Sequence, residues 1–324
     1  MLALGLLALV AVAAALIVVL ASAGGARTHR VSLAATVPSS FAVGLRVLRL
    51  SDTTRMIHLP NGGSEPRPLL TYVRYPALGP SHATDIANAP AARVHGPFPL
   101  VIFGHGFNVT PDLYKRILQA WARAGYVVAA PVFPLANPGA PGGPTESDLV
   151  NQPADMQFVI SRMLAYSSAP SGPFAGLIDP AAIAVSGQSD GGDTALAVAY
   201  NSNYRDPRVR AAIVLSGAEI PGVSGFTFTP GAPPLLAVQG SADAVNPPYL
   251  TEAFFQAAQR PKYLLTLPGA EHLPPYSDQQ PQLAIVERVT TAFLDAYLKH
   301  TKGASQRLRS PGKLGAAAVL HAEP

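Results

Sequence analysis

The sequence predicts an α/β protein in which a mostly parallel central sheet is flanked by helices on both faces. Two observations carry this prediction. Short, continuous apolar runs alternate with amphipathic stretches from residue 98 to residue 299, which is the pattern of parallel strands joined by covering helices. Hydrophobic residues make up 48% of the 324-residue chain and charged residues only 13%, so the chain can bury the core that such a sheet needs.

The first part of the expected domain departs from this pattern. Residues 41–52 and 54–59 alternate apolar and polar side chains, as half-buried antiparallel strands do. Asn-Gly-Gly at 61–63 is a turn signal, and it separates these strands from a third one at 69–76. Residues 77–97 are rich in alanine, proline and glycine and are predicted to be irregular.

The later elements each have a local signal. Continuous apolar runs predict buried parallel strands at 98–103, 126–131, 183–187, 210–217, 234–240 and 263–269. Apolar residues at helical spacing predict helices at 112–125, 153–164, 193–200, 248–259 and 282–299. Thr110 and Pro111 form a start signal for the first helix, and Gly125 is its stop signal. The connection between 217 and 234 is too short for a multi-helix lid.

The two ends of the chain lie outside the expected domain at 41–300. Residues 1–23 contain an uncharged apolar stretch long enough to span a bilayer, and Ala-Ser-Ala at 21–23 fits a signal-peptidase site. A cleaved signal peptide and a retained membrane anchor both fit this segment, and either one predicts an exported protein. Residues 24–40 have the composition of a linker, and the tail at 301–324 is expected to pack loosely.

The composition excludes several classes of function. The net charge is +4, but the basic residues are scattered singly, so no nucleic-acid-binding face is predicted. The absence of cysteine excludes thiolate catalysis, cysteine zinc sites and disulfides. No metal ion or organic cofactor is expected, and the sequence leaves the oligomeric state open.

The corner Gly-Gln-Ser-Asp-Gly at 187–191 joins a predicted strand to a predicted helix. Glycines two residues before and after Ser189 allow the backbone to turn sharply where it comes closest to itself. Such a corner exposes the serine hydroxyl above the sheet, and it matches the G-x-S-x-G pattern of a nucleophile elbow. This short pattern is a weak signal unless other elements supply a base and an acid.

An acid and a base follow two later strands. Asp243 comes just after the strand at 234–240, and His272 comes just after the next one. A serine hydroxyl needs a base to take its proton, and a carboxylate can hold that imidazole in the required tautomer. The order Ser189, Asp243, His272, each past a different strand, therefore predicts a catalytic triad. Asp190, Asp193 and Glu271 are rival acids, but they lie too close in sequence to the serine or the histidine.

The stretch "FGHGFNVT" follows the strand at 98–103 and supplies a candidate oxyanion site. Gly104 and Gly106 let the backbone fold back over the serine corner. The backbone N–H groups of Phe107 and Asp190 are then the predicted oxyanion donors. His105 is interpreted as a structural hydrogen-bonding residue rather than a catalytic one.

Five motifs resemble the α/β-hydrolase superfamily, over roughly residues 41–299. They are "VIFGHGFNVT", "AGYVVAAPVFP", "IDPAAIAVSGQSDGG", "LLAVQGSADAVNPP" and "PGAEH". The resemblance is to its lidless secreted esterases, a group that includes dienelactone-hydrolase-like, chlorophyllase-like and cutinase-like enzymes. It implies the same nucleophile, acid, base and oxyanion donors. The chain departs from many relatives in having Gln188 before the nucleophile and Asp190 after it.

These features lead to one expected function and two alternatives. The leading expectation is a serine hydrolase that cleaves a neutral short- to medium-chain carboxylic ester through an acyl-enzyme. The first alternative is acyl transfer to an acceptor other than water, because the same acyl-enzyme serves both reactions. The second is an exported binding module of the same fold without catalysis. The expected partner is a small-molecule or lipid-like ester, with membrane contact only through residues 1–23.

Overall fold

A computed structural model describes residues 40–309 and 315–324 of the chain. The predicted signal peptide or anchor at 1–23, and all but the last residue of the predicted linker at 24–40, lie outside these residues. Within the described ranges, no helix combines the length and the apolar character needed to cross a membrane.

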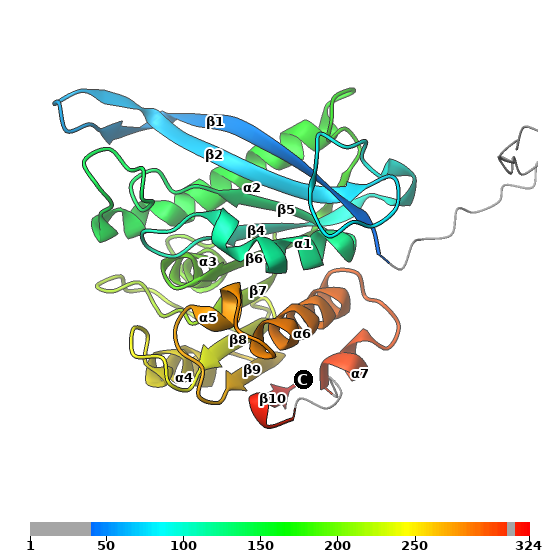
Figure 1. Cartoon of the computed structure of the whole chain (residues 1–324). Coiled ribbons are helices and arrows are strands. Elements are labelled where there is room, and N and C mark those ends of the chain that lie inside the picture. Colours follow the sequence, from blue (N-terminus) through cyan, green and yellow to red (C-terminus); the bar gives the residue numbers. More distant parts are fainter. Residues whose placement is uncertain (1–39, 310–314) are drawn as a thin grey trace, which may run out of the picture. The chain divides into compact units, whose positions relative to one another are not determined.

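A ten-stranded sheet runs through the described domain in the order β10-β9-β8-β7-β6-β4-β5-β2-β1-β3 (Figure 1). Six neighbouring strands are parallel: β4 (Phe98–Gly104), β5 (Val127–Pro131), β6 (Ile178–Gln188), β7 (Val209–Leu215), β8 (Leu235–Gly240) and β9 (Lys262–Leu267). Their apolar side chains are buried almost throughout, because helices cover both faces. The predicted fold class is confirmed.

The N-terminal strands form a long antiparallel hairpin, β1 (Ala42–His58) and β2 (Ser64–Ala77), and β2 pairs with β5. The turn lies at the predicted Asn-Gly-Gly. The two strands expected before that turn are one strand whose register shifts between Asp52 and Met56. The Asp52 carboxylate accepts hydrogen bonds from both the backbone and the hydroxyl of Thr54, which accounts for the local bulge. A two-residue strand, β3 (Ile86–Ala87), pairs with the start of β1.

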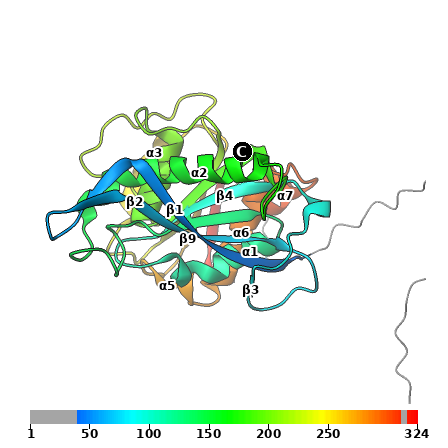
Figure 2. The ribbon, with the colours of Figure 1, turned by 90° about the horizontal axis from the view of Figure 1, so that it is seen from above.

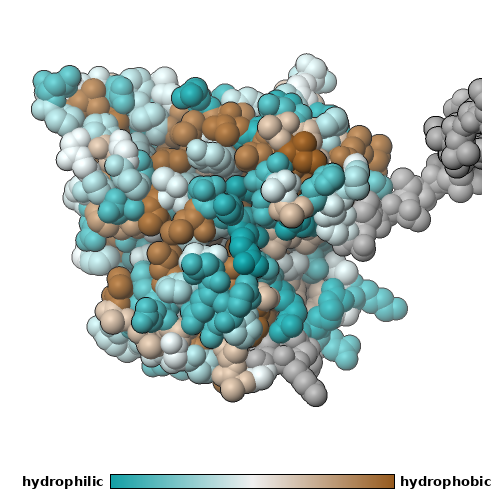
Figure 3. All heavy atoms as spheres, viewed as in Figure 1, coloured by the Kyte–Doolittle hydropathy of each residue, from teal (hydrophilic) through white to brown (hydrophobic). Residues whose placement is uncertain are grey.

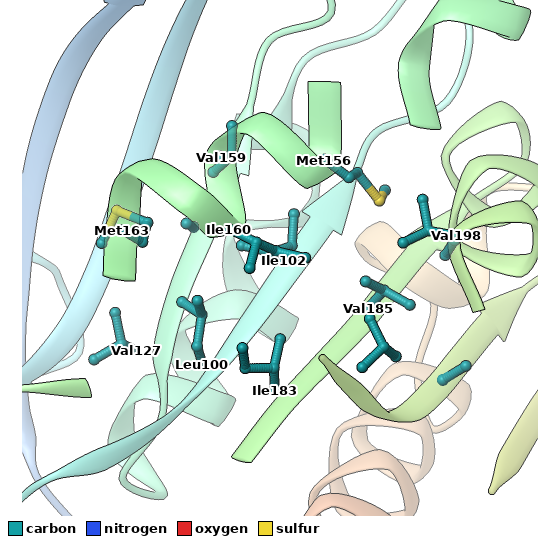
Figure 4. Packing of buried hydrophobic residues seen from close by; sticks show 14 of the residues in the cluster. Leu100, Ile102, Val127, Met156, Val159, Ile160, Met163, Ile183, Val185 and Val198 are labelled. Atoms are coloured by element: carbon teal, nitrogen blue, oxygen red, sulfur yellow. The ribbon is translucent and has the colours of Figure 1, made fainter. Parts of the chain in front are cut away.

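The helices divide between the two faces of the sheet (Figure 2). On one face, α2 (Gln152–Ser168), α3 (Asp190–Tyr200) and α4 (Pro248–Ala257) share one apolar core with the strands. Figure 4 shows Met156, Val159, Ile160 and Met163 packing against the side chains of β4 and β6. On the other face, α1 (Lys115–Arg123) and α6 (Gln282–Tyr297) share the second core. Helices thus cover both faces of the sheet, and a ligand can reach the strands only at their ends.

Short helical segments connect these elements. They are η1 (Arg93–His95), η2 (Pro111–Tyr114), η3 (Glu146–Asn151), α5 (Pro274–Ser277), α7 (Ala304–Arg309) and η4 (Gly315–Ala317). The segment η2 begins at the predicted Pro111, although the Thr110 side chain makes no capping hydrogen bond.

The C-terminal tail differs from the expectation. Instead of packing loosely, its last residues form β10 (Val319–Glu323), which pairs antiparallel with β9 and extends the sheet. Glu323 lies 3.2 Å from Arg260 Nε and 3.7 Å from Lys262 Nζ. The sheet of the expected domain at 41–300 thus continues into the tail. The physical reason is that β9 offers an open edge, and an added strand satisfies its backbone groups.

Candidate active site

Ser189 stands at the turn between β6 and α3 in a strained backbone conformation. Its φ is +54° and its ψ is −128°, a region that costs a non-glycine residue about 1–3 kcal/mol. The flanking glycines are required by close approach. A Cβ at Gly187 would lie 2.0 Å from the Gly191 carbonyl oxygen, and one at Gly191 would lie 2.1 Å from the Gly104 oxygen. The local chain therefore needs glycine on both sides of the serine, as the sequence predicts. The expected exposure of the serine is wrong, because the neighbouring loops leave Ser189 only 9% exposed.

The structure brings Ser189, His272 and Asp243 into one hydrogen-bonded chain. His272 Nε2 lies 2.9 Å from Ser189 Oγ, and His272 Nδ1 lies 2.8 Å from Asp243 Oδ2. The three residues follow β6, β9 and β8, whose carboxyl ends meet at one edge of the sheet. This arrangement allows His272 to take the hydroxyl proton while the carboxylate holds the imidazole. The catalytic roles themselves stay a prediction.

The Asp243 carboxylate is held in its ionised form. Burial by itself raises the pKa of Asp243, but hydrogen bonds from His272 and from the backbone of Asn246 outweigh burial and leave the pKa below its ordinary value. Asp243 Oδ1 accepts the N–H groups of Val245 and Asn246, at 3.0 and 2.9 Å. Its other oxygen, Oδ2, accepts the Nδ1–H of His272 and a longer hydrogen bond of 3.2 Å from the Gln239 amide.

The rival acids have other environments. Asp193 Oδ1 accepts the Ala218 N–H at 2.6 Å, and burial raises the pKa of Asp193 well above its ordinary value. Glu271 is exposed to solvent. Among the described acids, only Asp243 forms a hydrogen bond with the His272 ring.

His105 orients the peptide group that carries the predicted Phe107 donor. The Phe133 N–H donates to His105 Nε2 at 2.9 Å, so the ring proton is on Nδ1. That Nδ1–H donates to the Gly106 carbonyl oxygen at 2.7 Å. In a trans peptide the N–H points opposite to the carbonyl, so the Phe107 N–H is directed away from His105. No protein acceptor binds this N–H within the described residues.

The second predicted donor, Asp190, is the first residue of α3. Its N–H is one of those that an α-helix leaves without an intrahelical acceptor. The loop before Phe107 also closely approaches the nucleophile, since a Cβ at Gly106 would lie 3.2 Å from Ser189 Cβ. The geometry is thus compatible with both predicted oxyanion donors, whose role stays a prediction.

The neutral state of His105 leads to a prediction about stability and pH. Burial lowers the pKa of His105 to about 4, and the hydrogen bond to Gly106 opposes this only in part. The unfolded chain binds this proton below about pH 6.5, whereas the folded chain does not until about pH 4. The stability that the neutral ring provides is therefore present above pH 6.5 and lost as the pH falls through 4.

The comparison that isolates this group is between the wild type and His105→Asn. The advantage of the wild type in unfolding free energy should shrink by about 3 kcal/mol between pH 7 and pH 4. Urea unfolding of both proteins at each pH measures this difference, and other titrating groups cancel in the comparison. An advantage that stays constant with pH would contradict the prediction.

A cavity of about 390 Å³ opens over Ser189. Its apolar wall comes from several loops and consists of Phe107, Val109, Leu149, Pro221, Val245 and Leu273. Three acids, Glu146, Asp190 and Asp193, also line it, and no lysine or arginine does. Burial, reinforced by the charge of Glu146, raises the pKa of Asp190 to about 6. At neutral pH Asp190 therefore gives the cavity a negative potential together with Glu146, whereas burial favours the neutral form of Asp193.

Sequence reasoning missed Glu146, Leu149 and Pro221, because they lie in irregular connections without a motif. Within the described part of the chain, no group of three histidine, aspartate or glutamate side chains is arranged to hold a metal ion.

Comparisons with known proteins point to the same fold. The family model Chlorophyllase matches residues 83–227, a stretch that includes Ser189 but ends before Asp243 and His272. A solved structure of a ferulic acid esterase from Streptomyces cinnamoneus is similar with a TM-score of 0.67, at 20% identity, over 89% of this chain and 98% of that chain. A search of curated proteins finds no match.

Proposed function

We propose that this chain, an α/β-hydrolase of the esterase group, hydrolyses neutral carboxylic esters with Ser189 as its nucleophile. The observation that carries the proposal is the hydrogen-bonded chain Asp243–His272–Ser189, whose serine and histidine line a cavity with apolar and polar walls. The family match and the similar esterase structure support an ester hydrolase in the general sense. The triad, the substrate class and the mechanism are the proposal.

The proposed reaction has two halves. His272 Nε2 takes the proton of Ser189 Oγ as that oxygen attacks the ester carbonyl carbon. The oxyanion that forms accepts hydrogen bonds from the N–H groups of Phe107 and Asp190. Collapse of this intermediate breaks the ester bond, and His272 gives its proton to the leaving alkoxide. Water, activated by His272, then attacks the acyl-enzyme, which releases the carboxylic acid and restores Ser189.

The products distinguish hydrolysis from the alternatives. The purified protein is incubated with p-nitrophenyl butyrate, with and without added alcohols, and the acyl products are identified. Butyrate should be the main product at every alcohol concentration. A butyrate ester of the added alcohol as the main product would indicate an acyltransferase, and no turnover at all would leave a binding module.

The cavity lining leads to a prediction about substrate charge. A neutral ester should have a kcat/KM at least roughly 10-fold higher than the same ester with a carboxylate at the far end of its acyl chain, because Glu146 and Asp190 repel the second anion. Steady-state kinetics at pH 7.5 measure this ratio. The ratio should fall in Glu146→Gln, and in the wild type it should fall as the pH drops through 6 and Asp190 takes up a proton.

The matched control is Glu252→Gln, because Glu252 is exposed on α4 and outside the cavity lining. This variant should keep the wild-type ratio. Equal kcat/KM values for the two esters in the wild type would refute the proposed selection against anions.

We also propose that the protein is exported, on the basis of the uncharged apolar stretch within residues 1–23. Sequencing the N-terminus of the protein recovered from the cell exterior tests this, with Gly24 as the first residue expected after cleavage. Recovery only inside the cell would contradict export.

A further inference from the structure

Tyr114 and Gln188 form a buried hydrogen-bonded pair beside the proposed catalytic chain. The Tyr114 hydroxyl donates to Gln188 Oε1 at 2.7 Å, and the Gly106 N–H donates to the same hydroxyl at 3.3 Å. The Tyr114 oxygen accepts the Gly106 N–H, and the Tyr114 O–H donates its single hydrogen to Gln188 Oε1. This sets the orientation of the Gln188 amide, whose nitrogen then faces His272. Both side chains are at most 1% exposed.

The Gln188 amide nitrogen continues the connection to the histidine loop. It donates to the His272 backbone oxygen at 3.1 Å and lies 3.2 Å from His272 Nε2. That ring nitrogen has one lone pair, for which the Ser189 hydroxyl at 2.9 Å competes. The hydrogen bond from Tyr114 fixes Gln188 Oε1 and so directs the Gln188 NH₂ group toward the backbone oxygen of His272. The lone pair of His272 Nε2 is thereby left for the Ser189 hydroxyl.

The pair therefore connects three segments that are far apart in sequence: the loop at Gly106 and Phe107, the corner at Ser189, and the loop at His272. Contact at this junction is tight, since a Cβ at Gly106 would lie 2.9 Å from Gln188 Oε1. A small displacement of any one segment would move the oxyanion donor, the nucleophile or the base relative to the others. Displacements of about 1 Å can lower a rate roughly 100-fold.

We propose that Tyr114 and Gln188 are positioning residues that hold the Phe107 donor, Ser189 and His272 in mutual register. This inference rests on the proposed function, and neither side chain takes part in bond making or bond breaking. The loss of either partner should lower kcat rather than raise KM. Tyr114 and Gln188 border the cavity, but Tyr114→Phe keeps the ring, Gln188→Met keeps the size of the side chain, and the apolar residues of the wall are unchanged.

The test compares two losses of a buried tyrosine hydroxyl. In Tyr114→Phe, kcat for p-nitrophenyl butyrate should fall roughly 10- to 100-fold with KM within about 2-fold, and the rate of labelling by a fluorophosphonate should fall by the same factor. In the control Tyr200→Phe, a fully buried hydroxyl that donates to the Pro233 oxygen at 2.8 Å is removed away from the site. That variant should keep kcat within about 2-fold of the wild type.

A second variant tests whether the two residues act as one unit. Gln188→Met keeps a side chain of similar size but removes the polar contacts with the Tyr114 hydroxyl and with the backbone oxygen and ring nitrogen of His272. It should lower kcat as Tyr114→Phe does. The double variant should lose no more than about 2-fold beyond the worse single variant, because each single change already breaks the connection.

Wild-type kcat in either Tyr114→Phe or Gln188→Met, or losses that multiply in the double variant, would overturn the inference while leaving the esterase proposal intact. An inactive wild type would instead refute the proposed function. If Tyr114→Phe does not fold, Gln188→Met alone carries the test with the same expected and contradicting results.

Discussion

Ser189→Ala should lower kcat for a neutral ester by roughly six orders of magnitude, because no other group at this position can form the acyl-enzyme. The residual rate should come from binding and from the oxyanion donors. Alanine keeps the Cβ and removes only the hydroxyl. We therefore expect the backbone of the strained corner, at φ +54°, and of its flanking glycines to stay unchanged. Initial rates at high enzyme concentration measure the loss, with thermal unfolding as the check on folding.

Ser186→Ala is the matched control for this change. Ser186 lies on β6 three residues earlier, is fully buried, and its hydroxyl has no hydrogen-bond partner in the described structure. Its loss should leave kcat within about 2-fold. More than roughly 1% of wild-type activity in Ser189→Ala would place the nucleophile elsewhere.

Asp243→Asn should lower kcat by roughly 10⁴-fold without unfolding the protein. The reason lies in the partners of the carboxylate. Two backbone N–H groups point at Oδ1, whereas Oδ2 receives, besides His272, only the longer hydrogen bond from the Gln239 amide, so the asparagine oxygen takes the Oδ1 position. The new amide nitrogen then faces His272 Nδ1 and donates to it. The ring proton moves to Nε2, which can no longer accept the Ser189 proton.

Glu271→Gln is the control for the acid. Glu271 is adjacent to His272 in sequence but exposed, and its change should leave kcat within about 2-fold. An Asp243→Asn variant with near wild-type kcat would remove Asp243 from the triad. It would leave the assignment of Ser189 standing.

The fold and the triad geometry could be anticipated because their signals are local. Each strand of the parallel sheet is a continuous apolar run, and each residue of the proposed triad follows one of these runs directly. Once the strands are parallel, their carboxyl ends share one edge of the sheet, so Ser189, Asp243 and His272 must converge. The glycines at 187 and 191 likewise follow from the sharpness of a single turn.

The parts that could not be predicted depend on contacts between distant segments. Arg67 on β2 donates to Asp148 at 2.6 and 2.9 Å and to Asp155 at 2.7 Å, and all three side chains are buried. These bonds hold η3, and with it the Glu146 and Leu149 of the cavity wall, against the hairpin. A lone arginine in an alternating strand gives no sign of partners about eighty residues away.

The strand in the tail could not be predicted for a related reason. The only apolar run there, residues 314–320, is short and gives no strong strand signal, and its end forms part of β10 because β9 offers an open edge. The Tyr114–Gln188 connection is similar, because Tyr114 alone indicates only a buried aromatic residue. Its hydroxyl acquires a role only when η2 and the end of β6 are placed together.

Figure 3 shows that the apolar side chains on the viewed face form separate patches among polar ones. On this face, therefore, no single broad apolar surface competes with the cavity over Ser189 for an apolar ester.

The identity of the covalently modified residue tests the central claim most directly. The wild-type protein is treated with a fluorophosphonate, its intact mass is measured, and the modified peptide is mapped by tandem mass spectrometry. The account predicts one adduct per chain, on Ser189, that is absent in Ser189→Ala and forms far more slowly in Asp243→Asn. An adduct on any other residue, or no adduct in a folded protein that hydrolyses esters, would contradict it.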